Sequence, residues 1–158
     1  MQLKASCRCE AVRFHCFAYA PVPYLRCYCS ICRKTAGGGG YAINLGAWAD
    51  SLEIEGEDAI GMFHARIDGE ESPGERRFCR RCGSALWVSD PRWPELIHPF
   101  ASIIDTALPE PPEIVHIRLV DKAPWVRVPE GKGHRHFAEY PDESLADWHR
   151  RHGLFSER

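Results

Sequence analysis

Hydrophobic residues alternate with polar ones over short stretches along most of the chain. Val12, Phe14 and Cys16 fall on one side of a strand predicted over 12–17, which places Cys16 in the core. Further strands are predicted over 41–45, 52–55, 62–66, 85–88, 97–104, 114–119 and 125–128. Spacing this close leaves little room for helical crossovers. We therefore expect a mainly β fold whose sheets are mainly antiparallel.

Two segments carry helical signals instead. A short helical turn is predicted over 30–34 and should end at the run of glycines at 37–40. Those glycines either allow close backbone approach by a ligand or form a plain flexible turn. A short C-terminal helix is predicted over 142–152, before Gly153.

Composition fits an ordinary globular protein of 158 residues, with 44% hydrophobic and 27% charged residues. Lys and Arg number 20 against 22 Asp and Glu, a net charge of -2, so there is no electrostatic basis for binding nucleic acid or an anionic membrane. The N-terminus has no apolar signal segment and no stretch has membrane-spanning length. We therefore expect a cytoplasmic protein with no membrane partner.

Seven of the eight cysteines lie in three tight clusters. The clusters are Cys7 and Cys9; Cys27, Cys29 and Cys32; and Cys79 and Cys82. In a reducing compartment such clusters are typical of metal sites, and their loops are too short for useful structural disulfides. Seven thiolates divide into four and three, which predicts one closed zinc site and one zinc site with an open position.

The spacing within each cluster suits metal binding. Cys79 and Cys82 are separated by two residues and followed by Gly83, as in a zinc knuckle, and the Cys7 pair is a shorter grip of the same kind. The central triplet supplies three thiolates from six residues, leaving a fourth tetrahedral position for water or a substrate thiol. A thiol bound there would be deprotonated and hence nucleophilic.

Basic residues and histidines surround these clusters. The basic residues that could offset thiolate charge are Arg26, Arg33 and Lys34 beside the triplet, and Arg76, Arg77, Arg80 and Arg81 beside the last pair. The histidines that could complete the triplet's shell are His134, His136, His149 and His152. The sequence gives no reason to choose among these histidines.

Taken together, three ordered cysteine motifs resemble those of the glutathione-dependent formaldehyde-activating enzyme family, which includes centromere-protein-V-like domains. Residues 6–14 read SCRCEAVRF, residues 27–34 read CYCSICRK and residues 78–86 read FCRRCGSAL. The family carries C-x-C-G-A-V, C-H-C-S-x-C-R-K and F-C-x-x-C-G-S-x-L at these places. The resemblance spans residues 5 to about 128.

The resemblance implies a β-tent fold and two zinc ions per chain. It assigns a structural zinc to Cys7, Cys9, Cys79 and Cys82, and a second, open zinc to Cys27, Cys29 and Cys32. It also implies a zinc-dependent carbon–sulfur lyase or synthase that condenses formaldehyde with glutathione to S-hydroxymethylglutathione. Arg33 and Lys34 are then candidates to bind the glutathione carboxylates.

The chain departs from the family pattern at three places. Tyr28 stands where the family has a histidine, and Glu10 stands where it has a glycine. The extension 131–158 lies outside the shared motifs, and we expect it to belong to the same domain as the zinc-binding part, 1–130. Its helix is a candidate to cover the open zinc or to form a homodimer contact.

Two other functions fit parts of the pattern. In a non-catalytic zinc module both zinc ions are structural, and the surface binds a thiol ligand or a protein partner. In a thiol–disulfide protein, Cys29 with Cys32 or Cys79 with Cys82 is the working pair. Metal content and acceleration of the formaldehyde–glutathione reaction separate these functions from the enzyme.

Overall fold

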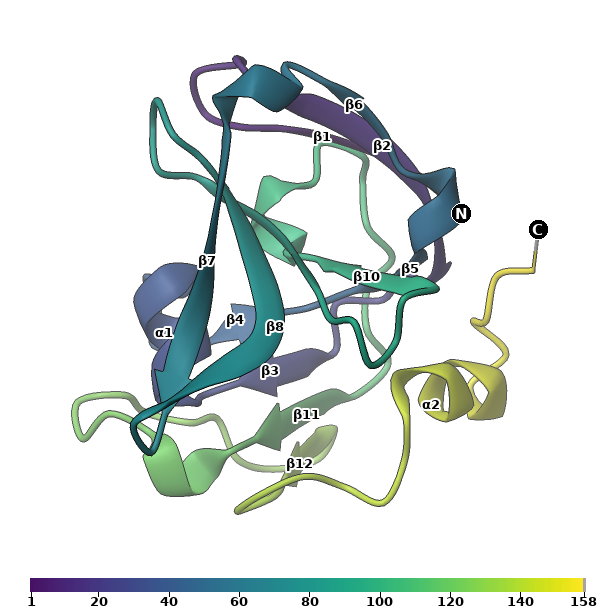
Figure 1. Cartoon of the computed structure of the whole chain (residues 1–158). Helices are drawn as coiled ribbons and strands as arrows, with labels where there is room; N and C mark the ends of the chain where they lie inside the picture. Colours follow the sequence, from purple (N-terminus) through teal and green to yellow (C-terminus); the bar gives the residue numbers. More distant parts are fainter. Residues whose placement is uncertain (158) are drawn as a thin grey trace.

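A computed structural model describes residues 1–157 and shows a mainly β fold (Figure 1). The larger sheet contains, in spatial order, β1 (Gln2–Ser6), β2 (Arg13–Ala20), β5 (Gly46–Trp48), β10 (Leu96–Pro99), β9 (Ala85–Ser89), β8 (Glu70–Cys79) and β7 (Ile60–Ile67), with β6 (Glu53–Glu55) paired to β2 off this path. The smaller sheet contains β12 (His134–His136), β11 (Ile114–Ile117), β3 (Leu25–Cys27) and β4 (Ala42–Ile43).

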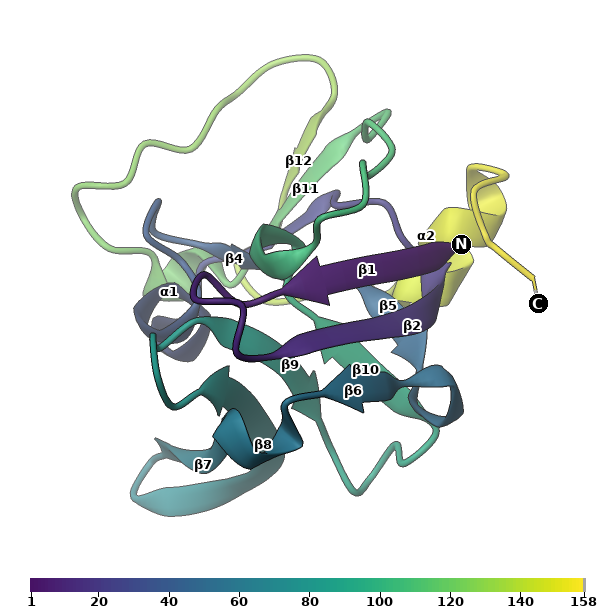
Figure 2. The ribbon, with the colours of Figure 1, turned by 90° about the horizontal axis from the view of Figure 1, so that it is seen from above.

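Strand pairing is mainly antiparallel, as the spacing of the strands predicted. Every pair in the larger sheet is antiparallel, and Figure 2 shows β1, β2 and β6 side by side. In the smaller sheet β11 runs parallel to both β3 and β12. Parallel strands cannot be joined by a short hairpin, and long segments of chain do separate these parallel partners in the sequence. The expectation of a mainly β, mainly antiparallel fold is confirmed.

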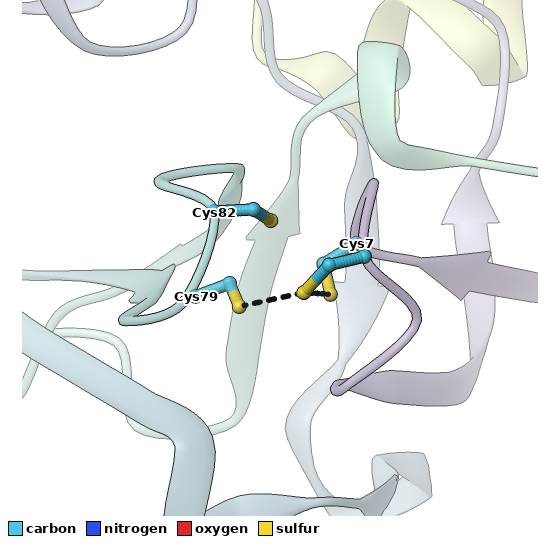
Figure 3. Close-up of side chains that lie close together, drawn as sticks. Cys7, Cys79 and Cys82 are labelled. Atoms are coloured by element: carbon cyan, nitrogen blue, oxygen red, sulfur yellow. Dashed lines mark hydrogen bonds between the residues drawn. The ribbon is translucent and has the colours of Figure 1, made fainter.

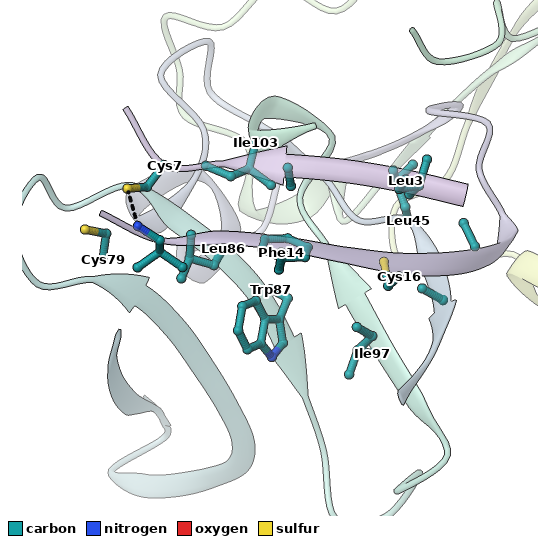
Figure 4. Packing of buried hydrophobic residues seen from close by; sticks show 14 of the residues in the cluster. Leu3, Cys7, Phe14, Cys16, Leu45, Cys79, Leu86, Trp87, Ile97 and Ile103 are labelled. Carbon is teal, nitrogen blue, oxygen red and sulfur yellow. Dashed lines mark hydrogen bonds between the residues drawn. The ribbon is translucent and has the colours of Figure 1, made fainter. Parts of the chain in front are cut away.

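The main core lies against the inner face of β2. Val12, Phe14 and Cys16 are buried there while Arg13 is exposed, so the alternation in the sequence is confirmed. Phe14 packs edge-on against Trp87 of β9, with ring centroids 5.0 Å apart (Figure 4). Cys16 is fully buried in this cluster, as expected of a core residue.

The two α-helices lie at opposite ends of β3 (Figure 1). Helix α1 (Ser30–Thr35) follows the C-terminal end of the strand, while α2 (Leu145–Arg151) packs at its start. Trp148 of α2 stacks on Tyr24 with ring centroids 3.7 Å apart. The His149 ring accepts a hydrogen bond from the Val22 amide at 3.0 Å. Helix α2 therefore anchors the C-terminal extension on the start of β3, away from α1.

Several strand predictions need correction. The predicted strand over 125–128 does not exist, because this segment is a loop in which Val126 packs on Tyr28. Of the predicted strand over 97–104, only β10 is extended, and the 3₁₀ turn Ala101–Ile103 follows it. Strands β1, β3, β5, β8 and β12 were not predicted. The charged sequence of β8 hides its strand character, which comes from pairing with β7 and β9 on both sides.

Candidate metal centres

The fold joins the first and last cysteine pairs. Cys7 and Cys9 lie in the turn that follows β1. Cys79 ends β8, and Cys82 lies in the next turn (Figure 3). All four sulfur atoms lie within 4.8 Å of one another. Residues far apart in the sequence thus form one compact group of four thiols.

The sulfur separations fit a metal of zinc's size. The sulfur of Cys9 lies 3.6 Å from that of Cys7 and 3.8 Å from that of Cys79. Two sulfurs about 2.3 Å from a shared tetrahedral centre would stand about 3.8 Å apart. No disulfide joins these residues, since all eight cysteines are free. The four-thiol group therefore has the size of a closed tetrahedral site.

Two tight turns aim these sulfurs inward. The amide of Val12 donates to the Cys7 sulfur at 3.3 Å, and the Cys7 amide donates to the Val12 carbonyl at 2.9 Å. The amide of Gly83 donates to the Cys79 carbonyl at 2.8 Å, with Gly83 at a positive φ of 75°. That φ explains the glycine of the knuckle motif.

Glu10 occupies a similar left-handed position in the first turn, with a φ of 60°. The family pattern has a glycine here, and the structure supplies the reason: only glycine adopts this conformation without steric cost. The Glu10 side chain forms an exposed ion pair with Arg13. With glutamate at this position the turn keeps its left-handed conformation, and the backbone at Glu10 is strained.

The central cysteines form a second, separate group. The sulfurs of Cys27, Cys29 and Cys32 also lie within 4.8 Å of one another. Cys27 ends β3, Cys29 is the N-cap of α1 and Cys32 lies in its first turn. The Cys29 sulfur accepts a hydrogen bond from the Cys32 amide at 3.3 Å. A strand end and a helix start thus bring three thiols together within six residues.

The electrostatics of this triplet favour one thiolate shared among three sulfurs. Hydrogen bonds from Cys27 and Cys32 to Cys29 hold the pKa of Cys29 far below its usual value, against the effect of burial. The hydrogen bond with Cys29 is also the largest cause that raises the pKa of Cys27. Three crowded thiols of this kind suit a cation that stabilises all of them as thiolates.

Within residues 1–157, no histidine joins either group of cysteines. His149 uses both ring nitrogens, one with the Val22 amide and one with the Leu145 carbonyl. His134 contacts His116, while His136 contacts the Pro129 carbonyl. The triplet is therefore three thiols without a protein histidine beside them.

The Tyr28 hydroxyl contacts a histidine of β11. It forms a 2.8 Å hydrogen bond with Nδ1 of His116, whose Nε2 lies 3.0 Å from Nδ1 of His134. The Tyr28 side chain is fully buried and packs beside Tyr41, Ala123 and Val126. At this position the tyrosine therefore ties β3 to β11.

The glycine run after α1 is shaped by packing. A Cβ atom on Gly37 would lie 2.3 Å from the Tyr41 carbonyl oxygen, and one on Gly40 would lie 2.3 Å from Val126. Gly38 and Gly39 are exposed. The structure therefore favours a packed turn over a ligand cradle at both ends of the run.

Among residues 1–157, three arginines carry a buried guanidinium nitrogen that has no hydrogen-bond partner. The atoms are Nε of Arg26, Nε of Arg33 and Nη1 of Arg76. Arg26 and Arg33 flank the triplet in sequence, and the charge of Arg76 acts on Cys32. The charge of Arg76 thus reaches the triplet, although in the sequence Arg76 stands beside the knuckle. Lys34, by contrast, is exposed.

The fold and the site define the class: a mainly β protein with one four-cysteine group and one three-cysteine group, each able to hold a metal ion. The chain belongs to the glutathione-dependent formaldehyde-activating enzyme family, whose model matches residues 2–119. No α-helix in the part of the chain described, residues 1–157, is long and apolar enough to cross a membrane.

Known relatives agree with this assignment. A Halomonas elongata protein, provisionally named a glutathione-dependent formaldehyde-activating enzyme, is 60% identical over 154 residues, covering 98% of each chain. A crystal structure of a Rhodobacter sphaeroides protein aligns with a TM-score of 0.52 at 24% identity, covering 67% of this chain and 91% of that one. The second match shows likeness of fold alone. The first extends through the C-terminal extension.

Proposed function

We propose that this protein binds zinc at both cysteine groups and condenses glutathione with formaldehyde to S-hydroxymethylglutathione at the triplet. The observation that carries the proposal is the contrast between the groups: four thiols in one, and three in the other with no fourth protein ligand within residues 1–157. Three protein ligands and a free position are the usual arrangement of catalytic zinc. Family membership supports the choice of substrates.

The reaction adds the S–H of glutathione across the C=O of formaldehyde, forming one C–S bond and one O–H bond. Zinc, when bound, would supply the positive charge that keeps a substrate thiol in its thiolate form. Cys27, Cys29 and Cys32 would hold this centre on the rigid junction of β3 and α1. Arg33 has a buried nitrogen there that meets no partner in the described part of the chain, which makes it a better carboxylate ligand than the exposed Lys34.

The four-cysteine group would then have a structural role. Cys7 and Cys79 are buried in the main core, and the group ties the N-terminal turn to the end of β8. Both groups consist of free thiols, which suits work in the reducing cytoplasm.

Exchange spectroscopy by NMR tests the proposed reaction directly. Zinc-loaded wild-type protein should increase the rate of exchange between formaldehyde and S-hydroxymethylglutathione above the spontaneous rate. Cys29→Ser should remove that increase and one zinc ion while the four-cysteine group keeps its own. Normal zinc and glutathione binding without acceleration would instead identify a non-catalytic binding module. Zinc-free protein with oxidised cysteine pairs would point to the redox role.

A further inference from the structure

A cavity of about 200 Å³ lies between α1 and the larger sheet. Thr35 at the end of α1 lines one side, and Phe78, Ala85 and Phe100 line the others together with two arginines, Arg76 and Arg77. The space is several times the ~30 Å³ that one water molecule occupies in the liquid. It is a mostly apolar cavity with two arginines in its wall, of which Arg77 is paired with Glu75.

Arg76 has no carboxylate partner within residues 1–157, and its Nη1 atom is buried without a hydrogen bond. Its neighbour Arg77 donates to Glu75 at 2.6 Å. Successive residues of a strand face opposite sides, so Arg76 shares its face with Phe78 while Arg77 shares its face with Glu75. A buried guanidinium donor without a partner is costly unless an anion meets it.

The cavity shares part of its wall with the hydrophobic cluster that contains the cysteine triplet. Its wall residues Ala85 and Phe100 pack in the same hydrophobic cluster as Cys27 and Cys32. Asn44 pairs with Phe100 and contacts the Cys32 sulfur at 3.9 Å. A ligand held at the triplet by sulfur could therefore extend an arm into the cavity.

We infer that this cavity is a carboxylate-binding subsite in which Arg76 binds one carboxylate of the thiol substrate. The inference rests on the proposed function, because it takes the triplet as the place where the substrate sulfur binds. Arg76 would thereby select thiols that carry a carboxylate at a fixed distance from sulfur. A guanidinium suits this task since its two parallel N–H groups match the two carboxylate oxygens.

The alternative is that Arg76 only offsets the negative charge of the cysteine sulfurs. Binding of S-methylglutathione separates the two roles, because its sulfur carries no proton to lose and its carboxylates are intact. Its dimethyl ester serves as the carboxylate-free partner ligand. Isothermal titration of the zinc-loaded protein with both ligands measures binding without any reaction.

Wild type should bind S-methylglutathione more tightly than the diester, and Arg76→Gln should weaken binding of the acid about 10- to 100-fold while leaving the diester unchanged. Arg66→Gln is the matched control, since Arg66 is an exposed arginine of the same hairpin that bonds only to the Gly69 carbonyl among its described partners. It should change neither affinity. Zinc content, measured in parallel, should stay at the wild-type value in both variants.

Three results would overturn the inference: equal weakening of both ligands by Arg76→Gln, no weakening of either, or no preference for the acid in wild type. Each result is independent of formaldehyde chemistry. If exchange is not accelerated but the acid is still selected through Arg76, the proposed reaction fails and the subsite stands. If exchange is accelerated but the acid is not selected through Arg76, the proposed reaction stands and the subsite fails.

Discussion

Loss of the four-cysteine site should destabilise the protein far more than loss of the triplet. The double change Cys9→Ser with Cys82→Ser takes one thiol from each limb of the site, and both residues are exposed, so little packing is lost. The buried sulfurs of Cys7 and Cys79 remain in the core. The variant therefore tests the metal cross-link and not the packing.

The size of the effect follows from the length of chain that the cross-link closes. Cys9 and Cys79 are 70 residues apart. Closing a loop of that length removes about 4 kcal/mol of chain entropy from the unfolded state, by the relation used for disulfides. A loss of this size corresponds to a fall in Tm of roughly 8–16 °C for a protein of this length.

Thermal unfolding followed by circular dichroism measures the loss, with zinc content determined on the same samples. Cys29→Ser is the matched control, because the triplet closes only short loops that β3 and α1 already hold. It should lose one zinc ion and less than about 2 kcal/mol. If both variants lose one zinc ion and the same stability, the division into a structural and an open site is wrong.

Three further predictions follow from single residues. Glu10→Gly should raise the free energy of unfolding by about 1 kcal/mol in urea titrations, since a glycine relieves the strain of the positive φ and loses only one exposed ion pair. An unchanged or lower free energy of unfolding would show that the backbone at Glu10 is not strained. Arg33→Gln should raise KM for glutathione while Lys34→Gln leaves it within about twofold, and equal effects would contradict the burial argument. Burial and the charges of neighbouring basic groups lower the pKa of His116 to about 4. The stabilising contribution of neutral His116 is therefore complete above the unfolded pKa of about 6.5 and is lost as pH falls towards 4. The loss amounts to up to about 2 kcal/mol after allowance for solvent screening. His116→Gln should therefore flatten the pH dependence of the free energy of unfolding in that range.

Local signals were strong enough to predict some parts of this fold. Alternation in β2 predicted its buried face because one side of the strand meets the core. The helix α2 begins after Ser144, whose hydroxyl accepts a hydrogen bond from the Asp147 amide at 3.1 Å, a cap that is readable in the sequence. Such features depend only on neighbouring residues.

Other parts depend on contacts between distant segments. β8 is charged and contains Pro73, yet it is a central strand because β7 and β9 pair with it on both sides. Val126 lies in a loop, because it packs on Tyr28 and Ala123 and not on a strand partner within residues 1–157. The same limit applies to Arg76, which stands beside the knuckle cysteines in the sequence but faces the cavity next to the triplet. Cysteine spacing could predict the clusters, but not which arginines surround them.

We propose that one metal centre is closed by four cysteines and that the other is left open by three. NMR of protein loaded with ¹¹³Cd tests it most directly, because the shift of each ion reports the number of sulfurs bound to it. We predict two resonances, of which only the one lost in Cys29→Ser moves when glutathione is added, towards the position of the four-sulfur site. One resonance, or two that glutathione leaves in place, would contradict this division into a closed and an open metal site.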